Sequence, residues 1–193
     1  MRRNVVDFSR LRILVVENHV LMRRLLHEML VGFGVPEIRT ARDVMEAIEC
    51  VYEEPFDAVI LDYVLVGLNG PDFAQTVRYD EECPNREVPI LMITGTPDHH
   101  KVAKVKEAGI NGMLAKPITP RTLYNRLYAM LAYPRPFIIS ADYVGPMRDR
   151  RSHKVAAAAP SRTRLARGAG AASRRPAARS RSGAIIDEDQ ILM

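Results

Sequence analysis

The chain has 193 residues, of which 47% are hydrophobic, and a formal net charge of +5. That length accommodates one domain with a tail, or two very small domains. No apolar run reaches the roughly 20 residues that a membrane helix needs, and the basic N-terminus does not lead into the apolar region of a signal peptide. Two cysteines, Cys50 and Cys83, provide neither a disulfide framework nor a metal cluster, so we expect a soluble, reduced, cytoplasmic protein.

The charge is divided unevenly along the chain. Residues 1–133 hold 16 Lys and Arg against 18 Asp and Glu, whereas residues 134–193 hold 12 Lys and Arg against 5 Asp and Glu. The net charges of the two parts are therefore −2 and +7. A mildly acidic body carries a basic arm, and the high isoelectric point does not indicate that the body binds nucleic acid.

Two periodicities alternate along residues 1–133. Short runs dense in Val, Ile and Leu are typical of buried strands, and apolar residues at helical spacing are typical of amphipathic helices. Strands are expected at residues 12–16, 56–61, 89–93 and 113–115, and within 36–41. Helices are expected at residues 19–31, 97–108 and 120–131, around 73–77, and over 44–51 with Asp43 as the cap.

Five strand–helix pairs in strict alternation predict an α/β protein with a doubly wound, parallel, five-stranded sheet and helices on both faces. Strands rich in branched apolar residues suit burial on both faces. In such open sheets, functional groups gather beyond the carboxyl ends of the strands, near the point where the strand order reverses. The polar residues that end each strand are therefore the candidate functional residues.

Four of the predicted strands end in polar residues. These are Glu17, Asn18 and His19 after the first strand, Asp62 after the third, Thr94 after the fourth and Lys116, followed by Pro117, after the fifth. As a set, in this order and spacing, they resemble the receiver domain of two-component response regulators of the stand-alone, chemotaxis-regulator type. The resemblance covers residues 11–132 and implies a (βα)5 flavodoxin-like sheet with the strand order 2-1-3-4-5.

The resemblance assigns the phosphoryl chemistry to the acidic residues. Asp62 would be the phosphoacceptor, which takes a phosphoryl group and becomes an acyl phosphate. Mg²⁺ would bind to Glu17, to Asp62 and to the backbone carbonyl of Val64, because this ion prefers hard oxygen ligands. Asn18 would be a weak further ligand, since it offers a neutral oxygen where the family usually has a second acid.

The resemblance also assigns the residues that would respond to phosphorylation of Asp62. Lys116 would pair with the phosphoryl oxygens as a point charge, and its bond to Pro117 is cis in the family. Thr94 would reorient to bond a phosphoryl oxygen. Met113 occupies the switch position on the fifth strand, where the family usually has an aromatic residue. A thioether can fill and vacate a pocket but cannot supply a Tyr hydroxyl, so the coupling to the output would differ.

Each of these residues also has an ordinary structural explanation. Asp62 could cap a turn, Thr94 could be a turn hydroxyl, and Lys116 could be an exposed loop residue. The functional interpretation is favoured because the residues occur together in the positions that the pattern requires. His99 and His100 resemble a metal pair, but adjacent residues do not share a helix face, so we expect exposed residues in a first helical turn.

The remaining chain is expected to form no second domain. Residues 134–151 form a segment that could pack on the domain of residues 1–133 through Phe137, Ile138 and Tyr143. Residues 152–193 are expected to be a disordered Arg- and Ala-rich tail with a short acidic and apolar end. This tail lacks the apolar core of a helix-turn-helix module, so no specific DNA binding is expected. Its arginines could hold nucleic acid non-specifically, although no aromatic residues lie among them.

These features predict a single-domain response regulator and not an enzyme. A sensor histidine kinase or phosphotransfer protein would phosphorylate Asp62, and a downstream protein would recognise the face formed by the fourth helix, fifth strand and fifth helix. A homodimer through the same face is a further expectation. The alternative is a degenerate receiver that binds proteins independently of phosphorylation, as Asn18 and Met113 suggest. A haloacid-dehalogenase-type enzyme is set aside, because Val64 stands where that chemistry needs a second acid.

Overall fold

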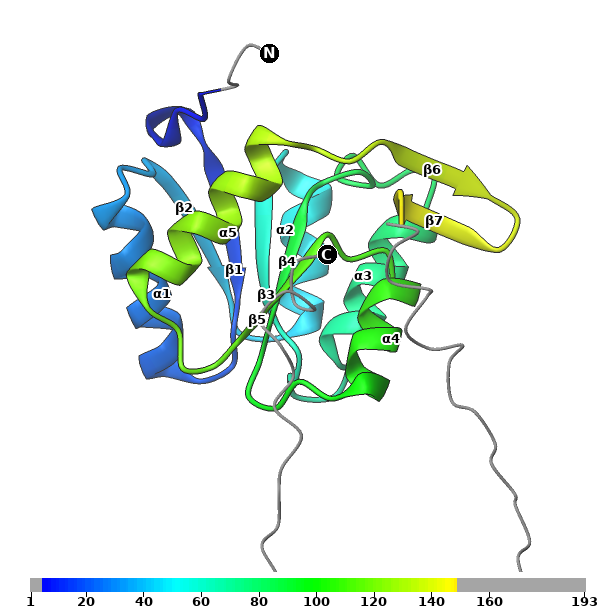
Figure 1. Ribbon diagram of the computed structural model, residues 1–193, viewed down its shortest axis with the longest axis horizontal. Coiled ribbons are helices and arrows are strands. Elements are labelled where there is room, and N and C mark those ends of the chain that lie inside the picture. Colours follow the sequence, from blue (N-terminus) through cyan, green and yellow to red (C-terminus); the bar gives the residue numbers. More distant parts are fainter. Residues whose placement is uncertain (1–4, 149–193) are drawn as a thin grey trace, which may run out of the picture.

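The computed structural model describes residues 5–148 (Figure 1), so the tail predicted at residues 152–193 lies outside the described part. The strands are β1 (Arg12–Val16), β2 (Glu37–Ala41), β3 (Ala58–Asp62), β4 (Ile90–Thr94), β5 (Gly112–Ala115), β6 (Phe137–Ser140) and β7 (Tyr143–Pro146). The helices are η1, a 3-10 turn (Phe8–Arg10), α1 (Val20–Gly32), α2 (Val44–Glu53), α3 (Gly70–Tyr79), α4 (His99–Glu107) and α5 (Pro120–Ala132).

Strands β1 to β5 form one parallel sheet in the order β2-β1-β3-β4-β5, which confirms the predicted fold class and strand order. Helices α1 and α5 cover one face of the sheet, and α2, α3 and α4 cover the other (Figure 1). In the sheet, β1 has β2 on one side and β3 on the other, so the direction in which successive strands are added reverses at β1. The carboxyl ends of β1 and β3 therefore lie side by side at the topological switch point.

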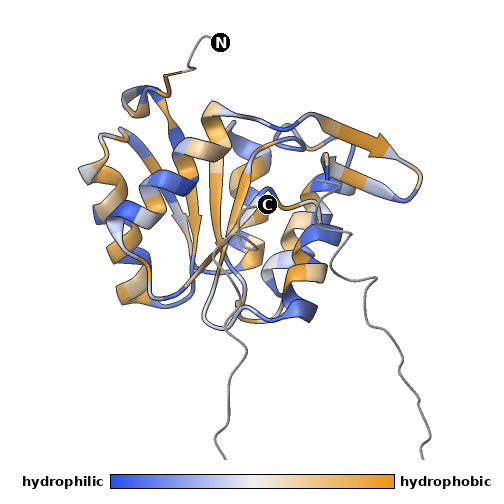
Figure 2. Cartoon of the chain, viewed as in Figure 1, coloured by the Kyte–Doolittle hydropathy of each residue, from blue (hydrophilic) through white to orange (hydrophobic). Residues whose placement is uncertain are grey.

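The alternation of side chains along the strands divides the core into two layers. Leu14 and Val16 pack in the layer beneath α2, α3 and α4, whereas Ile13 and Val15 pack in the layer beneath α1 and α5. All four side chains are fully buried. The central strands are the most continuously hydrophobic part of the fold (Figure 2). Burial on both faces explains why these strands carry apolar residues at successive positions.

Local signals in the sequence fix where several helices begin and end. The Asp43 carboxylate accepts a hydrogen bond from the backbone N–H of Glu46, which confirms the predicted cap of α2. Asp98 caps α4 in the same way, so this helix begins at His99, two residues later than predicted. Gly109, with a φ of 70°, follows its end. None of the helices in residues 5–148 has the length and apolar character that crossing a membrane requires.

Residues 137–146 form an antiparallel hairpin, β6–β7, which packs beside α3 and the end of α4 (Figure 1). Val144 is buried there, and its carbonyl oxygen would lie 2.4 Å from a Cβ atom at Gly109. The Phe137 ring lies 5.4 Å from the guanidinium of Arg78, a side chain with no exposed surface. This guanidinium donates to the carbonyl oxygens of Gly109 and Val88 at 3.0 and 2.6 Å. The hairpin therefore encloses a buried, hydrogen-bonded cation.

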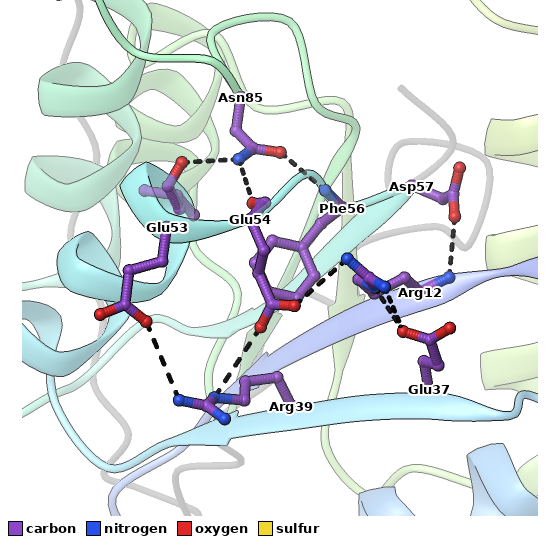
Figure 3. Close-up of polar contacts among 9 residues, drawn as sticks. Arg12, Glu37, Arg39, Glu53, Glu54, Phe56, Asp57 and Asn85 are labelled. Carbon is purple, nitrogen blue, oxygen red and sulfur yellow. Dashed lines mark hydrogen bonds and ion pairs between the residues drawn. The ribbon is translucent and has the colours of Figure 1, made fainter.

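A polar network closes the amino edge of the sheet, at the opposite end of β1 and β3 from the predicted site (Figure 3). The Arg12 side chain contacts both Glu37 on β2 and Glu54 after α2. Its backbone N–H donates to Asp57 at 2.7 Å. Buried Asn85 accepts from the backbone N–H of Phe56 and donates to two backbone carbonyls near the end of α2. These contacts hold the start of β3 against β1 and β2.

Candidate functional site

The carboxyl edge of the sheet collects the polar residues that the sequence analysis singled out. Glu17 follows β1, Asp62 and Thr94 are the last residues of β3 and β4, and Lys116 follows β5. Glu17 and Thr94 are each 1% exposed, and Asp62 is 7% exposed. Buried polar side chains in an otherwise apolar sheet carry a desolvation cost unless they are paired. The groups that pair with these buried side chains therefore decide how much their burial costs.

Lys116 joins the two acids. Its ammonium nitrogen lies 3.1 Å from Glu17 Oε2 and 3.0 Å from Asp62 Oδ1. Its backbone N–H donates to the Thr94 carbonyl oxygen at 2.8 Å, which aligns the chain after β5 with the end of β4. The Lys116–Pro117 peptide bond is cis. Three side chains from three separate segments thus meet as one ion-paired cluster.

The pKa values of this cluster follow from burial and pairing. Burial raises the pKa of Asp62, and the hydrogen bond from Lys116 opposes that rise while the nearby Glu17 charge adds to it. Burial lowers the pKa of Lys116, but its hydrogen bonds to Asp62 and Glu17 outweigh that effect and raise it. For Asp62, burial and the second carboxylate outweigh the single cation, whereas for Lys116 the two carboxylates outweigh burial.

The segment after β1 is held by contacts that no sequence motif predicts. Glu17 Oε1 accepts the backbone N–H of His19 at 3.0 Å, while Oε2 accepts from Lys116. The Arg23 guanidinium donates to the carbonyl oxygen of Glu17 at 2.7 Å. His19 Nδ1 accepts the backbone N–H of Met22, so this histidine caps α1. Arg23 lies six residues from Glu17 in the chain, and no sequence motif identifies it as part of the site.

The other predicted residues differ in their burial. Asn18 is exposed next to buried Glu17, and Val64 is 59% exposed two residues beyond Asp62. Met113 has no exposed surface and packs in the same core layer as Val105 of α4. The structure therefore brings Glu17, Asp62 and Lys116 into contact, with Thr94 buried at the neighbouring strand end.

A second contact connects the segments that follow β3 and β4. The Lys101 ammonium, on the first turn of α4, donates to the Thr96 carbonyl oxygen at 2.8 Å. It also lies 5.4 Å from the centroid of the Tyr63 ring, within reach of a cation–π interaction. Tyr63 follows Asp62 directly, so Lys101 links the start of α4 to the loop that begins at the candidate phosphoacceptor.

The two carboxylates at this edge suit a hard cation, because Mg²⁺ prefers oxygen ligands. The Val64 carbonyl and the Asn18 amide are further oxygens on the segments that follow β3 and β1. Within residues 5–148 no three His, Cys, Asp or Glu side chains cluster as a metal site would require, so backbone oxygen and water would have to complete the coordination. His99 and His100 are both exposed in the first turn of α4.

Comparison with known proteins gives a consistent result. The model of the response regulator receiver domain matches residues 13–128. Chemotaxis protein CheY-3 of Vibrio cholerae is 32% identical over 117 residues, which cover 61% of this chain and 88% of the relative. Chemotaxis protein CheY of Pseudomonas aeruginosa is 28% identical over 117 residues, covering 61% of this chain and 93% of the relative.

Solved structures agree. The chemotaxis response regulator CheY4 of Vibrio cholerae aligns with a TM-score of 0.56 and 30% identity, covering 61% of this chain and 95% of that one. A putative response regulator from Chloroflexus aurantiacus aligns with a TM-score of 0.58 and 33% identity, covering 63% and 98%. The chain therefore belongs to the family of response regulator receiver domains of the CheY type, and this membership implies signalling that depends on phosphorylation.

Proposed function

We propose that this chain is a single-domain response regulator that accepts a phosphoryl group on Asp62 from a sensor histidine kinase or a phosphotransfer protein. The observation that carries the proposal is the Lys116 ammonium between Glu17 and Asp62, 3.1 and 3.0 Å from their oxygens. This cation pays no reorganisation cost when negative charge arrives at Asp62, because it is already positioned there.

The geometry of the cluster supports the following transfer. A carboxylate oxygen of Asp62 attacks the phosphorus of the donor phosphohistidine, so that an O–P bond forms while the N–P bond breaks and the freed imidazole takes up a proton. Lys116 then balances the charge of the phosphoryl oxygens. Glu17, Asp62, the Val64 carbonyl and the weaker ligand Asn18 would hold Mg²⁺, which when bound neutralises charge on those same oxygens.

In this proposal the signal reaches the surface formed by α4, β5 and α5. Thr94 ends β4 next to the acceptor strand, and its hydroxyl would turn toward the new phosphoryl group. Met113, buried beneath α4, would repack in place of the usual aromatic residue. A downstream protein would recognise this surface, and two copies of the chain could also pair through it. The chain would act in the cytoplasm as an acceptor and not as an enzyme.

A labelling experiment tests the proposal. The full chain is incubated with Mg²⁺ and a small phosphodonor, beside Asp62→Asn and the control Asp57→Asn, which changes an acid at the opposite end of the same strand. Wild type and Asp57→Asn should form a phosphoprotein that hydroxylamine cleaves, and Asp62→Asn should not. Absence of label in wild type would favour the degenerate, phosphorylation-independent receiver that Asn18 and Met113 suggest. Label retained in Asp62→Asn would refute the assignment of the acceptor.

A further inference from the structure

The folded part of the chain is divided into two halves of opposite charge. Residues 1–98, which include β1 to β4, hold 10 Lys and Arg against 17 Asp and Glu, a net charge of −7. Residues 99–148, which include α4, β5, α5 and the hairpin, hold 8 Lys and Arg against 2 acids, a net charge of +6. The basic character is therefore a property of residues 99–148 as well as of the residues that follow.

Within the basic half, cations from separate segments converge at the end of α4. Lys104 and Lys106 lie in the last turn of this helix. Arg135, between α5 and β6, donates to the Asn111 carbonyl just beyond α4. Arg148 follows β7, with its guanidinium 3.9 Å from the centroid of the Tyr143 ring. We call Lys104, Lys106, Arg135 and Arg148 the basic patch.

The charges of Lys106, Arg135 and Arg148 repel one another. Partial burial, followed by the charges of Arg135 and Arg148, lowers the pKa of Lys106. Among residues 5–148, no carboxylate lies within 4.0 Å of the side-chain nitrogens of Lys104, Lys106 or Arg148, whereas many other surface cations of the fold are ion-paired. The helix dipole accounts for lysines in the last turn of α4, but not for arginines brought there by two other segments. Such a cluster gains stability when an anion neutralises it.

We propose that the basic patch binds the phosphate backbone of double-stranded nucleic acid, without sequence specificity. The chain continues from Arg148 with residues 149–193, which hold 10 Lys and Arg, nine of them Arg, against 4 acids. A guanidinium matches the geometry of a phosphate, and a duplex presents phosphates in a long regular array. Residues 149–193 contain no aromatic side chain for stacking on bases, so a duplex fits better than a single strand.

The salt dependence of binding tests this proposal. The full chain is titrated against a labelled duplex of mixed sequence, and binding is followed by fluorescence anisotropy from about 50 to 200 mM salt. The double variant Lys104→Gln/Arg148→Gln removes two exposed cations of the basic patch. If each contacts one phosphate, the slope of log K against log salt should decrease in magnitude by about 1.8. Affinity at about 100 mM salt should fall roughly tenfold or more.

Matched variants separate the basic patch from net charge and from phosphorylation. Arg24→Gln/Arg42→Gln removes the same charge from exposed positions on the acidic half, and should leave the slope unchanged. Asp62→Asn should bind the duplex like wild type, so the outcome is independent of the proposed phosphorylation. The proposal would be overturned if both double variants lost the same affinity. It would also be overturned if the slope of log K against log salt were unchanged in Lys104→Gln/Arg148→Gln, or if wild type did not bind at low salt. Poly-glutamate that displaces the duplex as effectively as competing duplex would assign the patch to acidic proteins instead.

Discussion

Replacing Lys116 by Met tests whether the ion-paired cluster is held together as described. The variant keeps an unbranched side chain of similar length but leaves Asp62 and the 1%-exposed Glu17 without their shared cation. Breaking a fully buried ion pair costs about 3–5 kcal/mol. Because the Lys116 side chain is 25% exposed and water screens its charge, we expect a loss of about 2–3 kcal/mol at pH 7.

The loss of stability should depend on pH, and the pKa of Asp62 determines whether it grows or shrinks as the pH rises. Burial raises the pKa of Asp62 in the folded protein, and removing the cation raises it further. A folded state that binds the proton more readily than the unfolded state loses stability as the pH rises through the folded pKa. The variant should therefore be closer to wild type at pH 5 than at pH 7, by about 1 kcal/mol, since one pKa unit corresponds to about 1.4 kcal/mol.

Urea unfolding followed by far-ultraviolet circular dichroism measures this difference in a chain that contains no Trp. The control Arg42→Met, which removes ion pairs of 3.6 Å to Asp43 and Glu46 from a 76%-exposed side chain, should cost less than about 1 kcal/mol. Adding Asp62→Asn to the Lys116→Met variant should restore part of the stability. Equal losses at pH 5 and pH 7, or no recovery with Asp62→Asn, would refute the described electrostatics.

Three further changes have expected outcomes. Asn18→Asp should bind Mg²⁺ several-fold more tightly in calorimetric titration, because it restores an anionic oxygen ligand; an unchanged affinity would exclude this position from the metal site. Val64→Asn should shorten the lifetime of the phosphoryl group in a dephosphorylation time course, because an amide can orient water where an exposed valine cannot; an equal rate would show that the apolar Val64 side chain does not slow hydrolysis. Gly109→Ala should lower stability by about 2–3 kcal/mol in thermal unfolding, because its Cβ would lie 2.4 Å from the Val144 carbonyl oxygen. Gly34→Ala, also at positive φ but with open space, should cost only about 1 kcal/mol, and similar costs at both positions would mean that the hairpin does not press on Gly109.

The sequence by itself determined the alternation of strands and helices and the polar residues at the strand ends. Both are local properties: apolar runs mark β1, β3 and β4, and Asp43 caps α2 through a neighbour three residues away. The boundaries moved by one or two residues, so that Asp62 and Thr94 became the last residues of their strands. The direction of the chain in a parallel sheet then places all these ends at one edge.

Only the tertiary structure decided which of these residues touch. Lys116 meets Glu17 across 99 positions of the chain, because β1 and β3 lie side by side and β5 ends at the same edge. Arg23 donates to the carbonyl oxygen of Glu17. The hairpin packs its Phe137 ring on Arg78, and no periodic pattern in the sequence predicts that the hairpin strands pair. Contacts between distant segments depend on strand order and side-chain reach, and these arise from the packing of the whole domain and not from any local run of residues.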